Sequence, residues 1–295
     1  MYRKYRKKEV ITAVLFLMPA AVLFAVFKYF PLIDNFRISL TNWNFFRPEK
    51  TFVGFQNFVS ILTSEKFWQI LGNTFFYTIW STLISIVIGF LLAVSLFRMR
   101  GHLPRVLKTL FFVPNVTTAS AMAILWMWIF DPDFGLSGQL FSLFGKESPR
   151  WLLTPGLAMW VVISLAVWRS MGYVMLIYTS GLAAISDEIY EAARIDGATQ
   201  TQQTLYITIP LLKSTSYFLL LTMFIQAMQV FDIVSVMTGG GPYDSTNVLN
   251  LYIYQMAFGR SRAGYASALS VILFLILLIC TVIQQLLTRG KEDEK

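Results

Sequence analysis

The chain has 295 residues, of which 56% are hydrophobic and only 14% are charged. Soluble domains carry about 25% charged residues, so this composition excludes an ordinary soluble fold and indicates a chain that lies in a lipid bilayer. The net charge of +8 does not indicate nucleic acid as a partner, because the Lys and Arg residues flank apolar runs and form no basic face with interleaved aromatic side chains.

Six apolar segments follow one another along the chain, each near the roughly 20 residues that an α-helix needs to cross the hydrocarbon core. They run from Val10 to Phe30, Leu71 to Phe97, Thr109 to Phe130, Pro155 to Ser180, Ser214 to Val236 and Ala263 to Leu287. The first follows a basic tail, as in a signal peptide, but no small-residue cleavage site comes after it. We expect an all-α integral membrane protein with six transmembrane helices.

The connections between these segments differ in their Lys and Arg content, which predicts the orientation of the chain. With a cytoplasmic N-terminus, the inner connections hold 14 Lys and Arg in 61 residues and the outer ones hold 9 in 92. Both termini are therefore predicted to be cytoplasmic. The expected organisation is a tail at 1–9, a membrane domain at 10–287 with a cytoplasmic loop at 181–213, and a tail at 288–295.

The loop at 181–213 is too polar to cross a bilayer and long for a simple connector. Ser186 or Asp187 can cap a short helix whose first turn is acidic. Gly197 can end this helix in a left-handed conformation, after which a second helix begins at about Thr199. The loop is predicted to be an amphipathic helix-turn-helix.

One face of the first predicted helix is apolar and includes two small alanines. It carries Ile185, Ile189, Ala192 and Ala193 at helical spacing. Such a helix can lie on lipid or dock in a protein groove, and lipid favours a Lys-rich polar face. The charged residues here are instead Asp187, Glu188, Glu191, Arg194 and Asp196. This mainly acidic set favours a protein groove.

The stretch from Glu191 to Pro210 resembles the EAA loop of ABC importer permeases. That pattern is E-A-A, three residues, G, nine residues, I, one residue and L-P. The chain has Glu191-Ala192-Ala193, Gly197, Ile207 and Ile209-Pro210, with Ile209 in place of the usual Leu. Weaker features in the expected order extend the resemblance to sugar permeases related to the maltose and glycerol-phosphate systems. They are Pro19, Pro31, Gly54, Asn57, Asn73-Thr74, Gly89, Ala93, Pro114, Trp126 and the run Thr238-Gly239-Gly240-Gly241-Pro242.

In that family the EAA helix is a coupling helix that docks in a cleft of a separate ATPase subunit. The resemblance implies that Glu191 makes a charged contact and that Ala192 and Ala193 allow close packing. Gly197, after Asp196, would form the turn. The resemblance further implies an ATPase dimer that binds ATP and Mg²⁺, a second permease subunit in a heterodimer, and an extracytoplasmic substrate-binding protein. The expected location is the plasma membrane of a bacterium or archaeon.

Polar side chains recur inside the fourth and fifth spans, and such residues usually face a cavity or the interior of a bundle. Arg169 shares a helix face with Tyr173, and Gln226 belongs to a polar stripe that includes Gln229. At about 1.5 Å of rise per residue, Arg169 and Gln226 both lie roughly 16–18 Å from the cytoplasmic ends of their helices. The two polar stripes are therefore expected to meet.

Tyr77 in the second span and Asn115 in the third complete the predicted substrate lining. Amide, phenol and guanidinium groups suit the hydroxyls of a neutral sugar. Two alternatives stay open: such residues can simply join helices, and Arg169 could clamp an anion such as glycerol phosphate. Asp232 is expected about 9 Å nearer the outside than Arg169, where it would orient the outer end of the fifth span.

The predicted outer loop from Thr238 to Asn250 contains three glycines and a proline. Exposed glycine backbone lets a partner approach closely. Gly240, Gly241, Pro242 and Tyr243 are therefore the predicted contact with the binding protein. A flexible connector is the alternative.

Other functional classes fit the sequence less well. A secondary transporter normally needs buried carboxylates, and Asp232 is the only Asp or Glu in a predicted span. His102 and Cys280 are the sole histidine and cysteine, and they supply neither a catalytic group nor a metal cluster. There is no G-x-x-x-x-G-K-[ST] motif for a nucleotide. We expect a sugar permease that is not an enzyme and holds no cofactor or metal.

Overall fold

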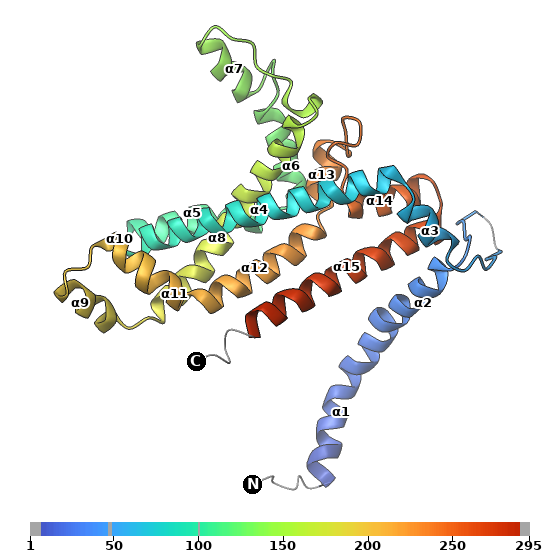
Figure 1. Cartoon of the computed structure of the whole chain (residues 1–295), viewed down its shortest axis with the longest axis horizontal. Helices are drawn as coiled ribbons and strands as arrows, with labels where there is room; N and C mark the ends of the chain where they lie inside the picture. Colours follow the sequence, from blue (N-terminus) through green and yellow to red (C-terminus); the bar gives the residue numbers. More distant parts are fainter. Residues whose placement is uncertain (1–6, 47–48, 100, 290–295) are drawn as a thin grey trace. The chain divides into compact units, whose positions relative to one another are not determined.

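The computed structural model describes residues 7–46, 49–99 and 101–289, and the regular structure of these residues is helical (Figure 1). Most of the two predicted tails lies outside the described residues. The helical segments are α1 (Lys7–Phe24), η1 (Ala25–Tyr29), α2 (Phe30–Ser39), α3 (Gln56–Leu62), α4 (Glu65–Phe97), α5 (Leu103–Val116), α6 (Ala119–Ile129), α7 (Leu136–Leu143), η2 (Trp151–Leu153), α8 (Leu157–Ala183), α9 (Asp187–Ile195), α10 (Gln200–Gln203), η3 (Thr204–Thr208), α11 (Ile209–Leu211), α12 (Lys213–Met228), α13 (Asp232–Met237), α14 (Leu249–Tyr254), η4 (Gln255–Gly259) and α15 (Ala263–Arg289).

Several of these segments are long and apolar enough to cross a membrane. Among the described residues they are Glu9–Ser39, Glu65–Phe97, Leu157–Ala183 and Ala263–Leu286. There are also two bent pairs of helices, α5 with α6 and α10–α11 with α12. If each pair counts as one span, the described residues contain six candidate membrane spans. The prediction of an all-α chain is confirmed, and each predicted apolar segment lies mainly on helix.

The third predicted span, Thr109 to Phe130, is not one straight helix. α5 and α6 meet at an angle of 102°, because Thr117 and Thr118 adopt extended backbone with ψ angles of 145° and 133°. Pro114 lies inside α5 just before this break. Its ring cannot donate an N–H to the helix and so weakens the last turn. The bend proves central to the site.

One compact unit comprises the segment up to Ser64 and residues 253–275. Within it, Asn57 at the start of α3 donates to the carbonyl oxygens of Ser39 and Thr41 at 2.8 and 2.9 Å. Gly264 at the start of α15 lies against Thr41, where a Cβ would come within 1.9 Å of the carbonyl oxygen. These contacts fix the chain between α2 and α3 onto the first turn of α15.

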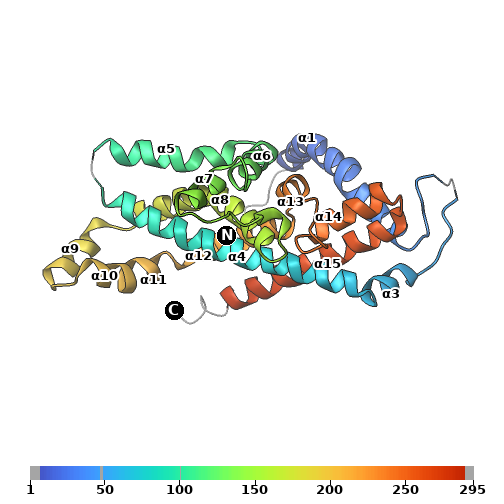
Figure 2. The same ribbon diagram turned by 90° about the horizontal axis from the view of Figure 1, so that it is seen from above.

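The second unit comprises Glu65–Tyr252 and the remainder of α15. Within it α8 packs against α4 and α5, and α12 packs against α4 (Figure 2). Glycines allow two of these approaches. A Cβ at Gly89 of α4 would lie 2.5 Å from Val174, and a Cβ at Gly172 of α8 would lie 1.9 Å from the carbonyl oxygen of Phe111. α8 therefore holds α4 and α5 at fixed positions beside the cavity described next.

Candidate functional site

The break between α5 and α6 leaves backbone groups without their helical partners, and such groups are costly inside a membrane. Arg169, in the middle of α8, donates from Nη2 to the carbonyl oxygen of Thr117 at 3.2 Å. The Nε atom of Arg169 is buried and has no hydrogen-bond partner among the described residues. The guanidinium thus stabilises the broken backbone with one nitrogen and keeps another for a further acceptor.

A cavity of about 390 Å³ lies beside this break. Five of the six predicted substrate-lining residues line it, namely Tyr77, Asn115, Arg169, Gln226 and Gln229. Tyr77 is buried, whereas Gln226 and Gln229 are exposed. The cavity is therefore closed by protein on the α4 side and accessible on the α12 side.

Tyr173, the sixth predicted residue, does not line this cavity. It packs against the hydrophobic cluster that includes Val174, Met175 and Tyr178. A residue four positions after Arg169 lies a full turn further along α8, beside the packed helices rather than the helix break. Contact between Tyr173 and the substrate stays a prediction.

Asp232 also lines the cavity, whereas from the sequence we expected it only to orient the outer end of the fifth span. That expectation assumed a straight fifth span, whereas α12 ends at Met228 and α13 begins at Asp232 itself. Asn250 donates to the carbonyl oxygen of Gln229 at 2.9 Å and so gives the broken backbone a partner. The rarity of acidic residues inside spans was a signal that could have assigned Asp232 to the cavity.

Two serines, Ser81 on α4 and Ser170 on α8, also line the cavity and were missed. Ser81 lies four residues after Tyr77, a spacing that puts both on one helix face and could have revealed it. The lining as a whole combines hydroxyl, amide and guanidinium groups with one carboxylate. It can make many hydrogen bonds to a polar solute.

The loop at 181–213 is a helix-turn-helix, as predicted. The Ser186 side chain accepts from the backbone N–H of Glu188 at 3.3 Å and caps α9. At the other end Gly197 has a φ of +79°. Ala198 N–H bonds Ala193 O, and Gly197 N–H bonds Arg194 O, the pair of bonds of a Schellman motif.

The second helix of this loop, α10, starts with a capping box. Thr199 accepts from the N–H of Gln202, and the Gln202 side chain accepts from the N–H of Thr199 at 2.7 Å. The turn between α9 and α10 is therefore fixed by caps at both ends.

The residues predicted to contact an ATPase subunit lie on the surface of this loop. Glu191, Ala192, Asp196 and Gly197 are exposed, and Ala193 is half-buried. Two large apolar side chains that the sequence did not single out are also strongly exposed, Ile195 at 87% and Tyr206 at 76%. Exposed apolar side chains next to charged ones are typical of a surface that a partner covers.

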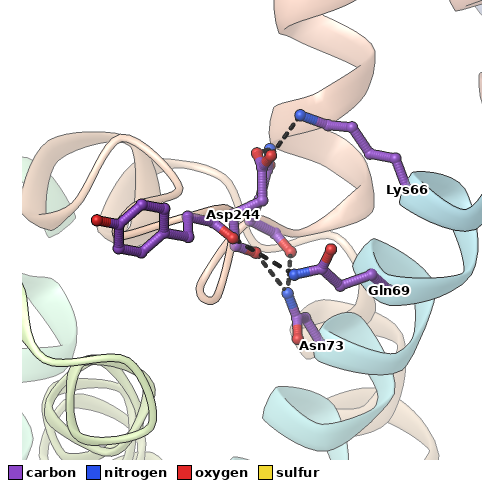
Figure 3. A network of polar contacts seen from close by, with 6 residues as sticks. Lys66, Gln69, Asn73 and Asp244 are labelled. Atoms are coloured by element: carbon purple, nitrogen blue, oxygen red, sulfur yellow. Dashed lines mark hydrogen bonds and ion pairs between the residues drawn. The ribbon is translucent and has the colours of Figure 1, made fainter.

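A network of polar contacts holds the turn at 243–247 against the first turns of α4 (Figure 3). Lys66 forms an ion pair with Asp244. Asn73 donates to the carbonyl oxygens of Asp244 and Asn247 at 2.8 and 3.1 Å. Asn247 in turn donates to the Asp244 carboxylate at 2.8 Å. These contacts tie the segment to α4 and count against the alternative of a flexible connector.

The four residues predicted to contact a binding protein differ in exposure. Gly240 is buried, because the loop folds back and the Asn247 side chain lies only 3.0 Å from the position that a Cβ on Gly240 would take. The contact predicted for Gly240 therefore has no exposed glycine backbone to support it. Gly241 and Pro242 are half-buried, and Tyr243 is 89% exposed with a φ of +52°. The loop therefore offers one aromatic side chain rather than open glycine backbone.

Comparison with known proteins identifies the family. Residues 85–293 match the family described as binding-protein-dependent transport system inner membrane component. A probable ABC transporter permease protein of Bacillus subtilis is 35% identical over 283 residues, which cover 95% of this chain and 97% of the relative. The chain belongs to this family. It is a permease subunit of an ABC transporter, a multi-pass membrane protein and not an enzyme, as predicted.

Other members of the permease family are similar over nearly their whole lengths. The trehalose/maltose transport system permease protein of Thermococcus litoralis is 31% identical over 98% of this chain and 97% of its own. The solved structure of a bacterial alginate ABC transporter with a periplasmic protein contains a chain that matches with a TM-score of 0.87 at 23% identity, covering 96% of both chains. That likeness supports the permease fold.

Proposed function

We propose that this permease carries a neutral sugar or oligosaccharide across the plasma membrane of a bacterium or archaeon, driven by ATP hydrolysis in a partner subunit. The cavity carries the proposal, because its hydroxyl, amide and guanidinium groups match the hydroxyls of a sugar. Relatives named for trehalose/maltose, multiple sugars and arabinooligosaccharides support the same substrate class.

The charges in the cavity favour a neutral substrate over an anion. Sites for phosphate commonly gather several cationic donors, and Arg169 is the only Lys or Arg among the described residues that line the cavity. Its guanidinium already donates to Thr117. Asp232 adds a negative charge to the same cavity, and this charge opposes the entry of an anion.

An acidic sugar is the second candidate. It is favoured by the buried Nε of Arg169, which has no partner among the described residues and can donate to a carboxylate or sulfonate. A sulfoquinovosyl glycerol transport system permease of Agrobacterium fabrum is 30% identical over 285 residues, which supports this version.

The proposed orientation has both termini and the loop at 181–213 in the cytoplasm, following the distribution of Lys and Arg. There Glu191 and the exposed face of α9 dock on an ATPase dimer, whose subunits hold ATP and Mg²⁺. A second permease subunit covers the accessible side of the cavity at Gln226, Gln229 and Asp232. On the opposite side, Tyr243 meets the binding protein that delivers the sugar, consistent with the family to which the chain belongs.

Uptake by the assembled importer tests the cavity. Gln226→Ala and Asn115→Ala should each reduce sugar uptake while the complex assembles normally. Thr222→Ala is the matched control, because Thr222 lies on the same helix as Gln226 and its hydroxyl donates to the Phe218 carbonyl of that helix at 2.8 Å. Normal uptake by both cavity variants would refute the assignment of this cavity to the sugar.

A further inference from the structure

The helix α4 joins the two loops on which the proposed partners act. It runs without interruption through 33 residues, a length of about 50 Å at 1.5 Å per residue. Its beginning contacts the turn at 243–247, and the residue after its last turn, Arg98, contacts α10 and η3 of the loop at 181–213.

At the beginning of α4, the contacts come from one face of the helix. Lys66, Gln69 and Asn73 follow at helical spacing, and all three point toward the turn in Figure 3. Asn73 bonds two backbone carbonyl oxygens and Lys66 pairs with Asp244. This end of α4 therefore holds the backbone next to the exposed Tyr243 at several points.

At the other end, Arg98 forms a fork of hydrogen bonds. Nη2 donates to the Gln200 carbonyl oxygen at 3.1 Å and to the Thr204 hydroxyl at 2.7 Å, and Nη1 donates to the Gln200 side chain at 3.3 Å. A planar guanidinium that bonds several acceptors fixes direction as well as distance. The loop at 181–213, the proposed coupling loop, is thus held to the end of α4 at the start of α10.

Between its ends α4 is packed too closely to bend freely. Gly89 lies against Val174, and the Ser85 and Ser170 hydroxyls are 2.7 Å apart. Tyr77 and Ser81 of the same helix line the cavity. A stiff element that touches both loops and the cavity can carry a change of arrangement from one to the others.

We propose that α4 transmits the docking of the binding protein at Tyr243 to the coupling loop, and that Asn73, Lys66 and Arg98 are the positioning residues that tie the helix to the two loops. This inference rests on the proposed function, because it takes these loops as the sites of the binding protein and the ATPase. When docking shifts the turn at 243–247, α4 moves with it and Arg98 pulls on α10.

The test is ATP hydrolysis by the assembled importer in lipid nanodiscs, with and without saturating sugar-loaded binding protein. Arg98→Ala should reduce the maximal stimulation about fivefold, at the lower end of measured couplings between distant sites, and keep basal hydrolysis and the half-saturating concentration of binding protein. Arg105→Ala, which removes an exposed arginine of α5, is the matched control and should behave as wild type.

Two further variants protect the test against misfolding. Thr204→Val removes the 2.7 Å bond from Arg98 and the 2.9 Å bond from the Thr204 hydroxyl to the Gln200 carbonyl oxygen, and should reduce stimulation about twofold. Exchanging Lys66 and Asp244 should restore stimulation that Lys66→Asp alone loses. Wild-type stimulation in Arg98→Ala and Thr204→Val would overturn the role of α4 and leave the importer function intact. A wild-type complex that the binding protein does not stimulate would refute both.

Discussion

Replacing Gly172 with alanine perturbs the contact that fixes one wall of the cavity. A Cβ there would lie 1.9 Å from the Phe111 carbonyl oxygen, whereas ordinary contact begins at 3.4 Å. α5 and α8 must part by roughly 1.5 Å or distort, and overpacking of this kind costs about 1–3 kcal/mol. Because α5 carries Asn115 and ends beside Thr117, the shift should also break the 3.2 Å bond from Arg169.

The assays are thermal unfolding of the purified complex and sugar uptake. Gly172→Ala should unfold at a lower temperature than wild type and transport less. Gly72→Ala is the control, because a Cβ at Gly72 of α4 meets no described atom within 4 Å. Alanine is favoured over glycine in a helix by about 0.5–1 kcal/mol, so this variant should be at least as stable as wild type. Equal stability and equal uptake in the two variants would refute the reasoning about close approach.

Three further predictions concern orientation, coupling and charge. In a Cys280→Ala background, a membrane-impermeant thiol reagent added outside should label a cysteine at Ser142 but not one at Gln202, and the reverse pattern would invert the proposed orientation. Gly197→Pro should weaken ATPase association and abolish uptake without preventing insertion, because proline cannot adopt the φ of +79°; full uptake would contradict the docking role. Arg169→Met should abolish uptake of an acidic sugar, but it should weaken the binding of a neutral sugar by only about 1.5–3 kcal/mol. Equal losses of uptake for the two sugars would contradict the charge argument.

Local features of the coupling loop could be predicted from the sequence alone. Ser186, Gly197 and Thr199 act through hydrogen bonds and backbone angles that involve residues a few positions away. Such interactions are the same in almost any tertiary context. The helix-turn-helix was therefore predicted with nearly correct bounds.

The cavity could be predicted in part. Arg169 and Gln226 lie on different helices, but depth along straight spans sufficed to bring them together, because a helix has a fixed rise per residue. The same assumption did not bring Asp232 to the cavity, since it left out the break of the fifth span after Met228. Depth along the helix also could not show that Arg169 lines the cavity and Tyr173 does not, because only the packing of the neighbouring helices decides which turn of α8 faces the cavity.

By itself the sequence determined that the chain is a helical membrane protein, which segments lie in helices and which loop carries the EAA pattern. These properties depend on composition and short-range pattern. The tertiary structure decided that the third span bends by 102°, that Gly240 is buried and that Asn73 and Arg98 tie α4 to two distant loops. Each joins groups far apart in the chain, and the partner of a polar side chain over such separations is set by how the helices pack, which no local pattern encodes.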